Sequence, residues 1–330
     1  MRSIKKPVTF SGGLATFCTQ LVAEKRNLGY HYFTEEYLMK NFDSFSLKYD
    51  CGNLLTKELT CAWLQSSNSQ NPKTLAAKAV VVRQLGIFMV RNGHAAYIIP
   101  ENSYSRISSK YMPHIFTLKE LIALFSEADN LKPDPHSPYR HLIIPLIFRM
   151  LYGCGLRVSE AIHLRVRDVD LENSALIILD SKFGKDRFVP MDITLKERCQ
   201  TYYDLLHRTS NPDDFFFQNR DGEYYLRQNV YMAFRKILWK CEISHGGKAH
   251  GPRVHDFRHT FAVHCLKRWV ENGYELSSAL PVLSTYLGHK TFAGTSRYLR
   301  LTAELYPTIT AAVEAKFSNL LPGGHSHEAN

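Results

Sequence analysis

The stretch HDFRHTFAVH, residues 255–264, carries polar side chains whose spacing suits two kinds of chemistry. His255 and His259 are four positions apart, so on a helix they would share one face, as the two histidines of H-E-x-x-H zinc sites do. His255 and Arg258 are three positions apart and would also share a face, an arrangement that suits binding of a phosphate. The residues elsewhere in the chain are needed to distinguish a metal site from a phosphate site.

Three further segments carry polar side chains of a related kind. They supply Arg157 and Glu160 in GLRVSE, Lys182 in DSKFGKD, and His289 and Tyr298 in LGHKTFAGTSRY. Two arginines, a lysine and two histidines around one point would form a strongly cationic pocket, which suits the charge on phosphate in a transition state. A tyrosine beside that pocket would be a candidate nucleophile, because nearby cations stabilise the anion of a phenol, whose ordinary pKa is about 10.

The same segments offer little to a metal ion, so we expect neither a bound metal nor a cofactor. The seven cysteines are scattered and never form a C-x-x-C pair, which argues against a thiolate zinc site and a disulfide framework. A zinc hydrolase is an alternative, with His255 and His259 as ligands and a third ligand from His264 or His289. It has Asp256 where the zinc motif has a general-base glutamate, and it leaves Arg157, Lys182 and Tyr298 unexplained.

The order and spacing of these groups resemble the tyrosine recombinases, the phage-integrase family of site-specific DNA recombinases. The resemblance runs from about residue 113 to about residue 305 and rests on five motifs in the family's order. They are G-L-R-x-S-E at 155–160, K-x-R-x-V-P at 185–190 after a turn lysine, H-x-x-R at 255–258, L-G-H at 287–289, and a tyrosine nine residues later. The turn has S-K-F-G-K where a common family form is G-K-G-x-K, and Lys182 rather than Lys185 occupies the position of the turn lysine.

The resemblance implies a reaction and a role for its main residues. Arg157 and Arg258 would hold the non-bridging oxygens of the scissile phosphate by bidentate hydrogen bonds. Tyr298 would attack the phosphorus to form a 3′-phosphotyrosyl bond. Because that bond keeps the energy of the phosphodiester, a 5′-hydroxyl from another strand can reverse the attack without ATP or metal. Strand cleavage and rejoining are then one reaction run in two directions.

Other residues of the site would support this reaction. The resemblance makes Lys182 the general acid that protonates the leaving 5′-hydroxyl, and it makes His255 a residue that assists proton transfer around the tyrosine. His289 would donate a hydrogen bond to the phosphate, and Glu160 would position or support the site. His259 would pack against or hydrogen-bond its own helix. The H-x-x-x-H spacing would then be a by-product of two histidines with different roles.

Two further alternatives also involve DNA. A DNA-binding protein that has lost catalysis would not need the complete set of six polar residues. Type IB topoisomerases and telomere resolvases share much of this chemistry. The two-domain length and the L-G-H motif favour a recombinase over both of them.

The length and the charge of the chain indicate its number of domains and the kind of partner it binds. With 330 residues, 45% of them hydrophobic, the chain can form about two domains of roughly 100–200 residues each. Its 41 Lys and Arg against 31 Asp and Glu give a net charge of +10, which favours a polyanionic partner such as nucleic acid. Residues 1–112 hold 14 of the basic and 7 of the acidic residues, so the first third is the more cationic part.

Helical patterns fill the first third of the chain and most of the remainder. In the first third we expect four helices, within residues 11–29, 34–49, 56–66 and 71–93. A linker rich in Ser, Tyr and Pro follows, with a domain boundary near residue 110. Thr117 and Glu120 fit a capping box at the start of the next helix. The β-signal is limited to a hairpin of residues 175–179 and 187–191.

The predicted fold is therefore mainly α with a small β-sheet, arranged in two domains. As the resemblance implies, residues 1–110 would be a helical, SAM-like core-binding domain and residues 111–320 an α+β catalytic domain. Residues 321–330 are expected to form a disordered tail.

The resemblance also implies the partners. They are double-stranded DNA with a specific recombination site and further copies of the chain, four on two DNA sites and one or two in solution. The task would be integration and excision or transposition of a mobile element, or dimer resolution. No apolar run approaches the ~20 residues of a membrane helix, and the start of the chain lacks the apolar segment of a signal peptide. We therefore expect a cytoplasmic, nucleoid-associated protein with no membrane partner.

Overall fold

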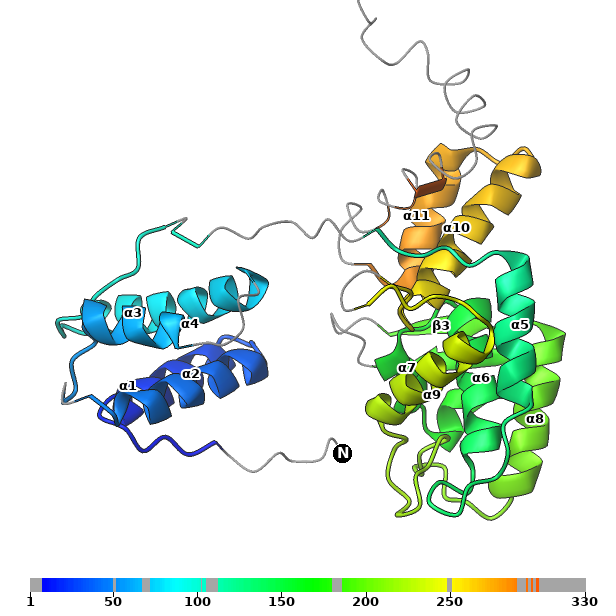
Figure 1. Ribbon diagram of the computed structural model, residues 1–330, viewed down its shortest axis with the longest axis horizontal. Coiled ribbons are helices and arrows are strands. Elements are labelled where there is room, and N and C mark those ends of the chain that lie inside the picture. Colours follow the sequence, from blue (N-terminus) through cyan, green and yellow to red (C-terminus); the bar gives the residue numbers. More distant parts are fainter. Residues whose placement is uncertain are drawn as a thin grey trace, which may run out of the picture. The chain divides into compact units, whose positions relative to one another are not determined.

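The computed structural model describes residues 8–49, 52–66, 72–101, 103–104, 112–179, 186–247, 251–289, 295, 298 and 301–302. The chain separates into two compact units, residues 1–110 and 111–330 (Figure 1). Each unit has its own apolar core. Helices dominate the described part of both units, and the three-stranded sheet belongs to the second. The predicted fold class, mainly α with a small β-sheet, is confirmed.

The first unit contains the four helices expected from the sequence. They are α1 (Ala15–Asn27), α2 (Phe33–Ser46), α3 (Lys57–Gln65) and α4 (Pro72–Arg91). Their apolar stripes meet in a core where the rings of Phe42 and Trp63 pack edge to face, with centroids 5.0 Å apart. Asp43 on α2 accepts hydrogen bonds from the backbone N–H groups of Ser11 and Gly12 at 2.8 and 2.9 Å. This buried carboxylate ties the segment before α1 to α2.

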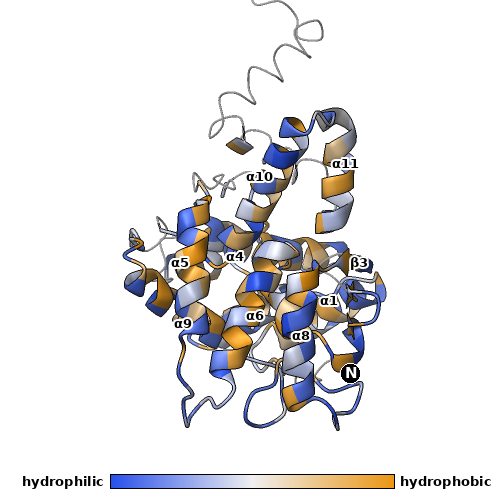
Figure 2. Ribbon diagram, turned by 90° about the vertical axis from the view of Figure 1, so that its right-hand side faces the viewer, coloured by the Kyte–Doolittle hydropathy of each residue, from blue (hydrophilic) through white to orange (hydrophobic). Residues whose placement is uncertain are grey.

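The second unit is built around one apolar helix. Within its described residues, its helices are α5 (Leu118–Asp129), α6 (Arg140–Gly153), α7 (Val158–Ile162), α8 (Ile193–Leu206), α9 (Arg227–Lys240), α10 (Asp256–Glu271) and α11 (Leu276–Leu287), with a 3₁₀ turn η1 (Val166–Asp168). Helix α6 packs against α5, α7, α8 and α10, and the hydropathy colours of Figure 2 make it one of the more apolar helices. The capping box predicted at Thr117 and Glu120 is present at the start of α5.

The sheet of the second unit has the strand order β1 (Val169–Asp170), β2 (Ala175–Ile178), β3 (Arg187–Pro190), with antiparallel neighbours. Strands β2 and β3 form the predicted hairpin, whereas the two-residue β1 was not predicted. Leu176 pairs with Val189 and Ile178 pairs with Arg187, so these four side chains share one face of the sheet. Three of them are buried apolar residues, and this register places the guanidinium of Arg187 on the inward face.

Within the described ranges, no helix combines the length and the apolar character needed to cross a membrane.

Candidate active site

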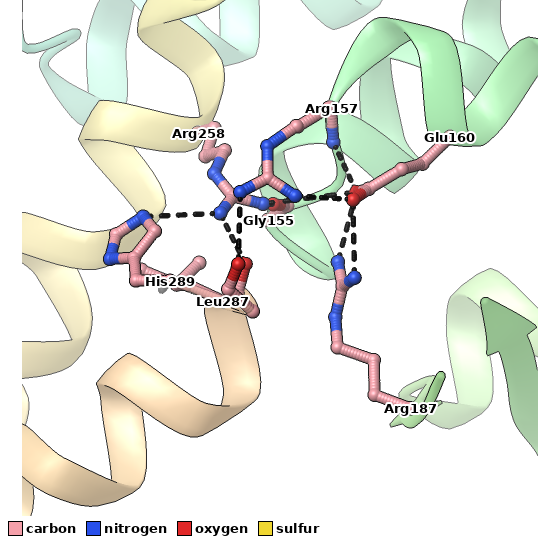
Figure 3. Close-up of polar contacts among 8 residues, drawn as sticks. Gly155, Arg157, Glu160, Arg187, Arg258, Leu287 and His289 are labelled. Atoms are coloured by element: carbon pink, nitrogen blue, oxygen red, sulfur yellow. Dashed lines mark hydrogen bonds and ion pairs between the residues drawn. The ribbon is translucent and has the colours of Figure 1, made fainter. Parts of the chain in front are cut away.

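Four segments of the second unit bring three arginines and a histidine together (Figure 3). Arg157 precedes the first residue of α7, Arg187 begins β3, Arg258 lies in the first turn of α10, and His289 follows the end of α11. Lys182, the predicted general acid, lies outside the described residues.

Two glycines let the chain turn sharply at this site and direct their carbonyl groups into it. Gly155 has a φ of 59° and Gly288 a φ of 63°, in the left-handed region that glycine enters without steric cost. The Gly155 carbonyl accepts a hydrogen bond from Nη1 of Arg258 at 2.6 Å, and the Gly288 carbonyl accepts one from Nη2 of Arg157 at 3.1 Å. Each arginine is thus held by the glycine of another motif.

Glu160 lies among three guanidinium groups. Its Oε1 accepts a hydrogen bond from Arg157 at 2.6 Å, and its two oxygens accept from Nη1 and Nη2 of Arg187 at 3.1 and 2.9 Å. Nη1 of Arg258 lies 3.8 Å from Oε2. Burial alone would raise the pKa of this carboxyl, but the hydrogen bonds and charges of Arg187 and Arg157 outweigh it and lower the pKa. Glu160 is therefore an anion at neutral pH.

Arg258 is the most enclosed of the three arginines. Only 1% of its side chain is exposed, and Nη2 donates to the carbonyl of Leu287. Burial and the charge of Arg157 lower the pKa of Arg258 to about 10, which still leaves it cationic at neutral pH. Arg157 is less enclosed, with 15% of its side chain exposed. Of these two arginines, Arg157 is the more accessible to a molecule arriving from solvent.

The two predicted site histidines are neutral at pH 7. Burial, followed by the charges of Arg258 and Arg157, lowers the pKa of both His255 and His289 to about 4. Nη2 of Arg258 lies 3.3 Å from Nε2 of His289 and can only donate, so we assign the ring hydrogen of His289 to Nδ1. That nitrogen then donates to Oγ1 of Thr295 at 2.8 Å. Among the described groups of the site, positive charge at neutral pH therefore comes from the arginines.

The low pKa of His255 predicts a loss of stability in weak acid. The unfolded chain takes up this proton near pH 6.5 and the folded chain only near pH 4, so stability falls as the pH drops through that interval. The slope for one histidine is at most about 1.4 kcal/mol per pH unit. We expect calorimetry between about pH 6.5 and about pH 4.5 to show a smaller decrease in melting temperature for His255→Gln than for the wild type. Equal slopes would contradict a neutral, half-buried His255.

Tyr298 is enclosed, with 2% of the residue exposed. Its hydroxyl lies 3.0 Å from Nδ1 of His259, within hydrogen-bond distance. Its ring stacks on that of His289, with centroids 6.0 Å apart. The ring of His259 in turn meets the ring of His255 edge-on at 4.8 Å. The structure therefore brings the tyrosine selected by its spacing together with three histidines.

Two side chains at this site were not predicted to function in it. Arg187 was treated as a residue of the hairpin, and His259 was expected only to pack against or hydrogen-bond its helix. The structure places Arg187 on Glu160 and adds a contact between His259 and the Tyr298 hydroxyl. The arginine of K-x-R-x-V-P and the four-residue spacing from His255 were the signals that could have identified them.

The zinc alternative requires three ligands around one point. In the part of the chain that the structure describes, no group of three or more His, Cys, Asp or Glu side chains is placed to hold a metal ion. His259 contacts Tyr298, and His289 contacts Arg258 and Thr295. These two histidines are arranged around a tyrosine and an arginine.

Comparison with known proteins decides between the remaining alternatives. Residues 114–304, more than half of the chain, match the family described as "Phage integrase family". The chain belongs to the phage integrase family. It is a tyrosine-type site-specific recombinase, an enzyme that breaks and rejoins DNA strands.

Relatives of this phage integrase family member include both integrases and Xer recombinases. A Sinorhizobium fredii protein described as an integrase/recombinase, y4rB, is 27% identical over 91% of this chain and 96% of its own length. The tyrosine recombinase XerA of Pyrococcus horikoshii is 32% identical over 65% of this chain and 66% of its own length.

Solved structures support the same fold. The XerH recombinase bound to palindromic difH substrate superposes with a TM-score of 0.57 at 19% identity, over 85% of this chain and 80% of that one. A lambda integrase dimer bound to a COC′ core site gives a TM-score of 0.60 at 14% identity, over 86% of this chain and 76% of that one.

Proposed function

We propose that the active site of this recombinase consists of Arg157, Glu160, Lys182, His255, Arg258, His289 and Tyr298. Its substrate is double-stranded DNA with a specific recombination site. The observation that carries the proposal is the contact chain from Tyr298 through the stacked His289 to Arg258. A nucleophile beside a guanidinium suits attack on phosphate, because the guanidinium fork donates parallel hydrogen bonds to phosphate oxygens.

In the proposed reaction, Arg157 and Arg258 bind the non-bridging oxygens of the scissile phosphate. A bond forms between Oη of Tyr298 and phosphorus while the bond from phosphorus to the 5′ oxygen breaks. The phenolic proton leaves toward the neighbouring histidines, and Lys182 protonates the departing 5′ oxygen. The 3′-phosphotyrosyl bond retains the energy of the phosphodiester. A 5′-hydroxyl of another strand therefore reverses the attack without ATP or metal.

Phosphate binding also gives His289 its role. The negative charge of a phosphate raises the pKa of a nearby histidine and counters the opposite effect of Arg258. Nε2, which now accepts from Arg258, then carries a proton and donates it in a hydrogen bond to a phosphate oxygen. Glu160 supports this arrangement by fixing the fork of Arg157.

The distribution of charge along the chain supports a different role for each of the two units. Residues 1–110 form the core-binding domain and residues 111–320 the catalytic domain in this proposal, and residues 321–330, the expected tail, lie outside the described part. The first 112 residues hold 14 basic and 7 acidic residues, which favours phosphate contacts there. Solved neighbours are described as XerH bound to difH substrate and a Tn1549 transposon integrase with circular intermediate DNA. For this recombinase we further propose an assembly of four protomers on two DNA recombination sites.

The biological task in this proposal is integration and excision or transposition of a mobile element, or dimer resolution, at the nucleoid in the cytoplasm. The names of the relatives cover both kinds of task, since integrases and Xer recombinases both occur among them.

A covalent-adduct assay tests this function. Purified protein is mixed, in EDTA, with nicked double-stranded DNA taken from the flanks of its own gene, and the products are separated on a denaturing gel. The nick lets the cleaved strand end diffuse away, so the protein stays on the DNA. We expect a slower protein–DNA band that is unchanged by EDTA, because Tyr298 supplies the nucleophile and arginines supply the positive charge. A band that appears only with added metal would contradict the proposal.

A further inference from the structure

Arg187 is the arginine of this site to which the reaction above gives no role. It begins β3 opposite Ile178, and 9% of its side chain is exposed. Both Nη atoms donate to the Glu160 carboxylate, one to each oxygen, as Figure 3 shows. Nη1 also lies against the turn after α11, since a Cβ on Gly288 would be 3.1 Å from it. Arg187 therefore touches the acid and the turn that together hold Arg157.

The cluster of charged side chains around Glu160 has an excess of positive charge. Three guanidinium groups surround one carboxylate, which gives a net charge of +2 for the cluster of Arg157, Glu160, Arg187 and Arg258. His255 and His289 add nothing at neutral pH, because their pKa values are about 4. Without Arg187 the cluster would hold one carboxylate and two guanidiniums, a net charge of +1. Arg187 thus supplies half of the net charge.

The reaction needs that charge at one stage in particular. A phosphodiester carries one negative charge, and attack by the tyrosine oxygen adds negative charge to the phosphoryl group, carried by its oxygens, before the leaving oxygen is protonated. Fixed cations directed at developing charge are often the largest single contribution to catalysis. Without Arg187, the carboxylate of Glu160 would still accept from Arg157, and its negative charge would offset the charge of Arg157 and Arg258 at the place where negative charge develops in the reaction.

We propose that Arg187 is a positioning residue of the recombinase: by donating to both oxygens of Glu160, it offsets the negative charge that this carboxylate places beside the two phosphate-binding arginines. The inference rests on the proposed function. Arg187 acts through Glu160 and does not itself contact the phosphate. A role in stability alone explains the geometry less well. The Nε of Arg187 is buried without a hydrogen-bond partner among the described residues, and a buried ion pair is weak evidence for stability.

Single-turnover cleavage of the nicked DNA tests this inference. Arg187→Met should slow cleavage about 100-fold, in the range found when one fixed donor to a developing anion is removed, and should change the dissociation constant for DNA much less. Arg187→Lys keeps the charge but loses the two-pronged hold, so it should fall between Arg187→Met and the wild type. The matched control is Arg149→Met, because Arg149 makes an equally bidentate pair with Asp129, at 2.8 and 2.7 Å.

The decisive variant combines two substitutions. Glu160→Gln in the Arg187→Met background removes the carboxylate and returns the net charge of the cluster from +1 to +2. We expect the double variant to cleave at least about tenfold faster than Arg187→Met, although it lacks one more hydrogen-bonded ion pair. A structural role predicts the opposite, since each lost contact would weaken the site further. A double variant as slow as Arg187→Met, or slower, overturns the inference.

A substrate with sulfur at the 5′-bridging position separates this role from an effect on Lys182, which precedes β3 in sequence. A thiolate leaves without being protonated, so a defect caused by loss of the general acid disappears on this substrate. The Arg187→Met defect should persist on this substrate. If the defect disappears, Arg187 acts by supporting Lys182 in the hairpin, and the inference is wrong. Wild-type protein that forms no adduct refutes the proposed function itself. Wild-type activity in Arg187→Met refutes only the inference.

Discussion

Tyr298→Phe is expected to form no covalent adduct with DNA at all, while DNA binding stays close to that of the wild type. The substitution removes one oxygen, the one that bonds to phosphorus in the proposed reaction. It also removes the 3.0 Å contact with His259 but leaves the stack on His289 in place. The ring therefore still fills its buried position. The measurement is the denaturing-gel assay with nicked DNA, together with a binding titration on the same DNA.

The matched control is Tyr286→Phe. Tyr286 lies on α11 and stacks on Phe261, with ring centroids 5.5 Å apart. Burial raises the pKa of its hydroxyl, which makes this phenol a worse nucleophile than an exposed one. We expect Tyr286→Phe to form the adduct normally. Strand cleavage by Tyr298→Phe, or its loss in Tyr286→Phe with folding intact, would assign the nucleophile elsewhere.

Arg157→Lys is expected to lower the cleavage rate by about 10²–10³-fold, the cost of removing one preorganised donor to a developing oxyanion. The guanidinium of Arg157 bridges Glu160 and the Gly288 carbonyl, and the side chain is partly exposed. A single ammonium cannot bridge both groups and also present two parallel donors to a phosphate. The charge is kept, so DNA binding should weaken far less than cleavage. Single-turnover rates and binding titrations measure the two effects separately.

Arg149→Lys is the control for this change, because it makes the same substitution in a bidentate pair that joins α6 to α5. It should leave the cleavage rate within about twofold of the wild type. Its melting temperature should change little, since surface ion pairs contribute about 0–1 kcal/mol. If Arg157→Lys cleaves as fast as this control, Arg157 does not bind the scissile phosphate.

The sequence was sufficient for the parts of the site that depend on local turns. Gly155 and Gly288 occur next to site residues in G-L-R and L-G-H, and left-handed turns are where glycine is expected. The structure adds something that spacing does not contain: the carbonyl of each glycine accepts from the arginine of a distant motif. Such pairings depend on how α7, α10 and α11 pack, and one sequence does not encode that packing in any local pattern.

Arg187 and His259 show where sequence reasoning ends. In a strand, the face on which a side chain lies depends on the register of the hairpin, and a shift of one residue would turn Arg187 outward. His255 and His259 are one helical turn apart, so helix periodicity places both on nearly the same face and does not say which one meets the tyrosine. The position of Tyr298 beside α10 determines that His259 is the histidine that contacts the tyrosine hydroxyl. The low pKa values of His255 and His289 also depend on burial, which residue types do not reveal.

The identity of the amino acid joined to DNA tests the central claim most directly. Adduct formed on nicked DNA in EDTA is digested with nuclease and then with trypsin, and the peptide that carries the remaining nucleotide is sequenced by mass spectrometry. We predict a 3′-phosphotyrosyl linkage at Tyr298. A linkage at another tyrosine, or at a serine or histidine, would contradict the site built here around Arg157, Arg258 and His289.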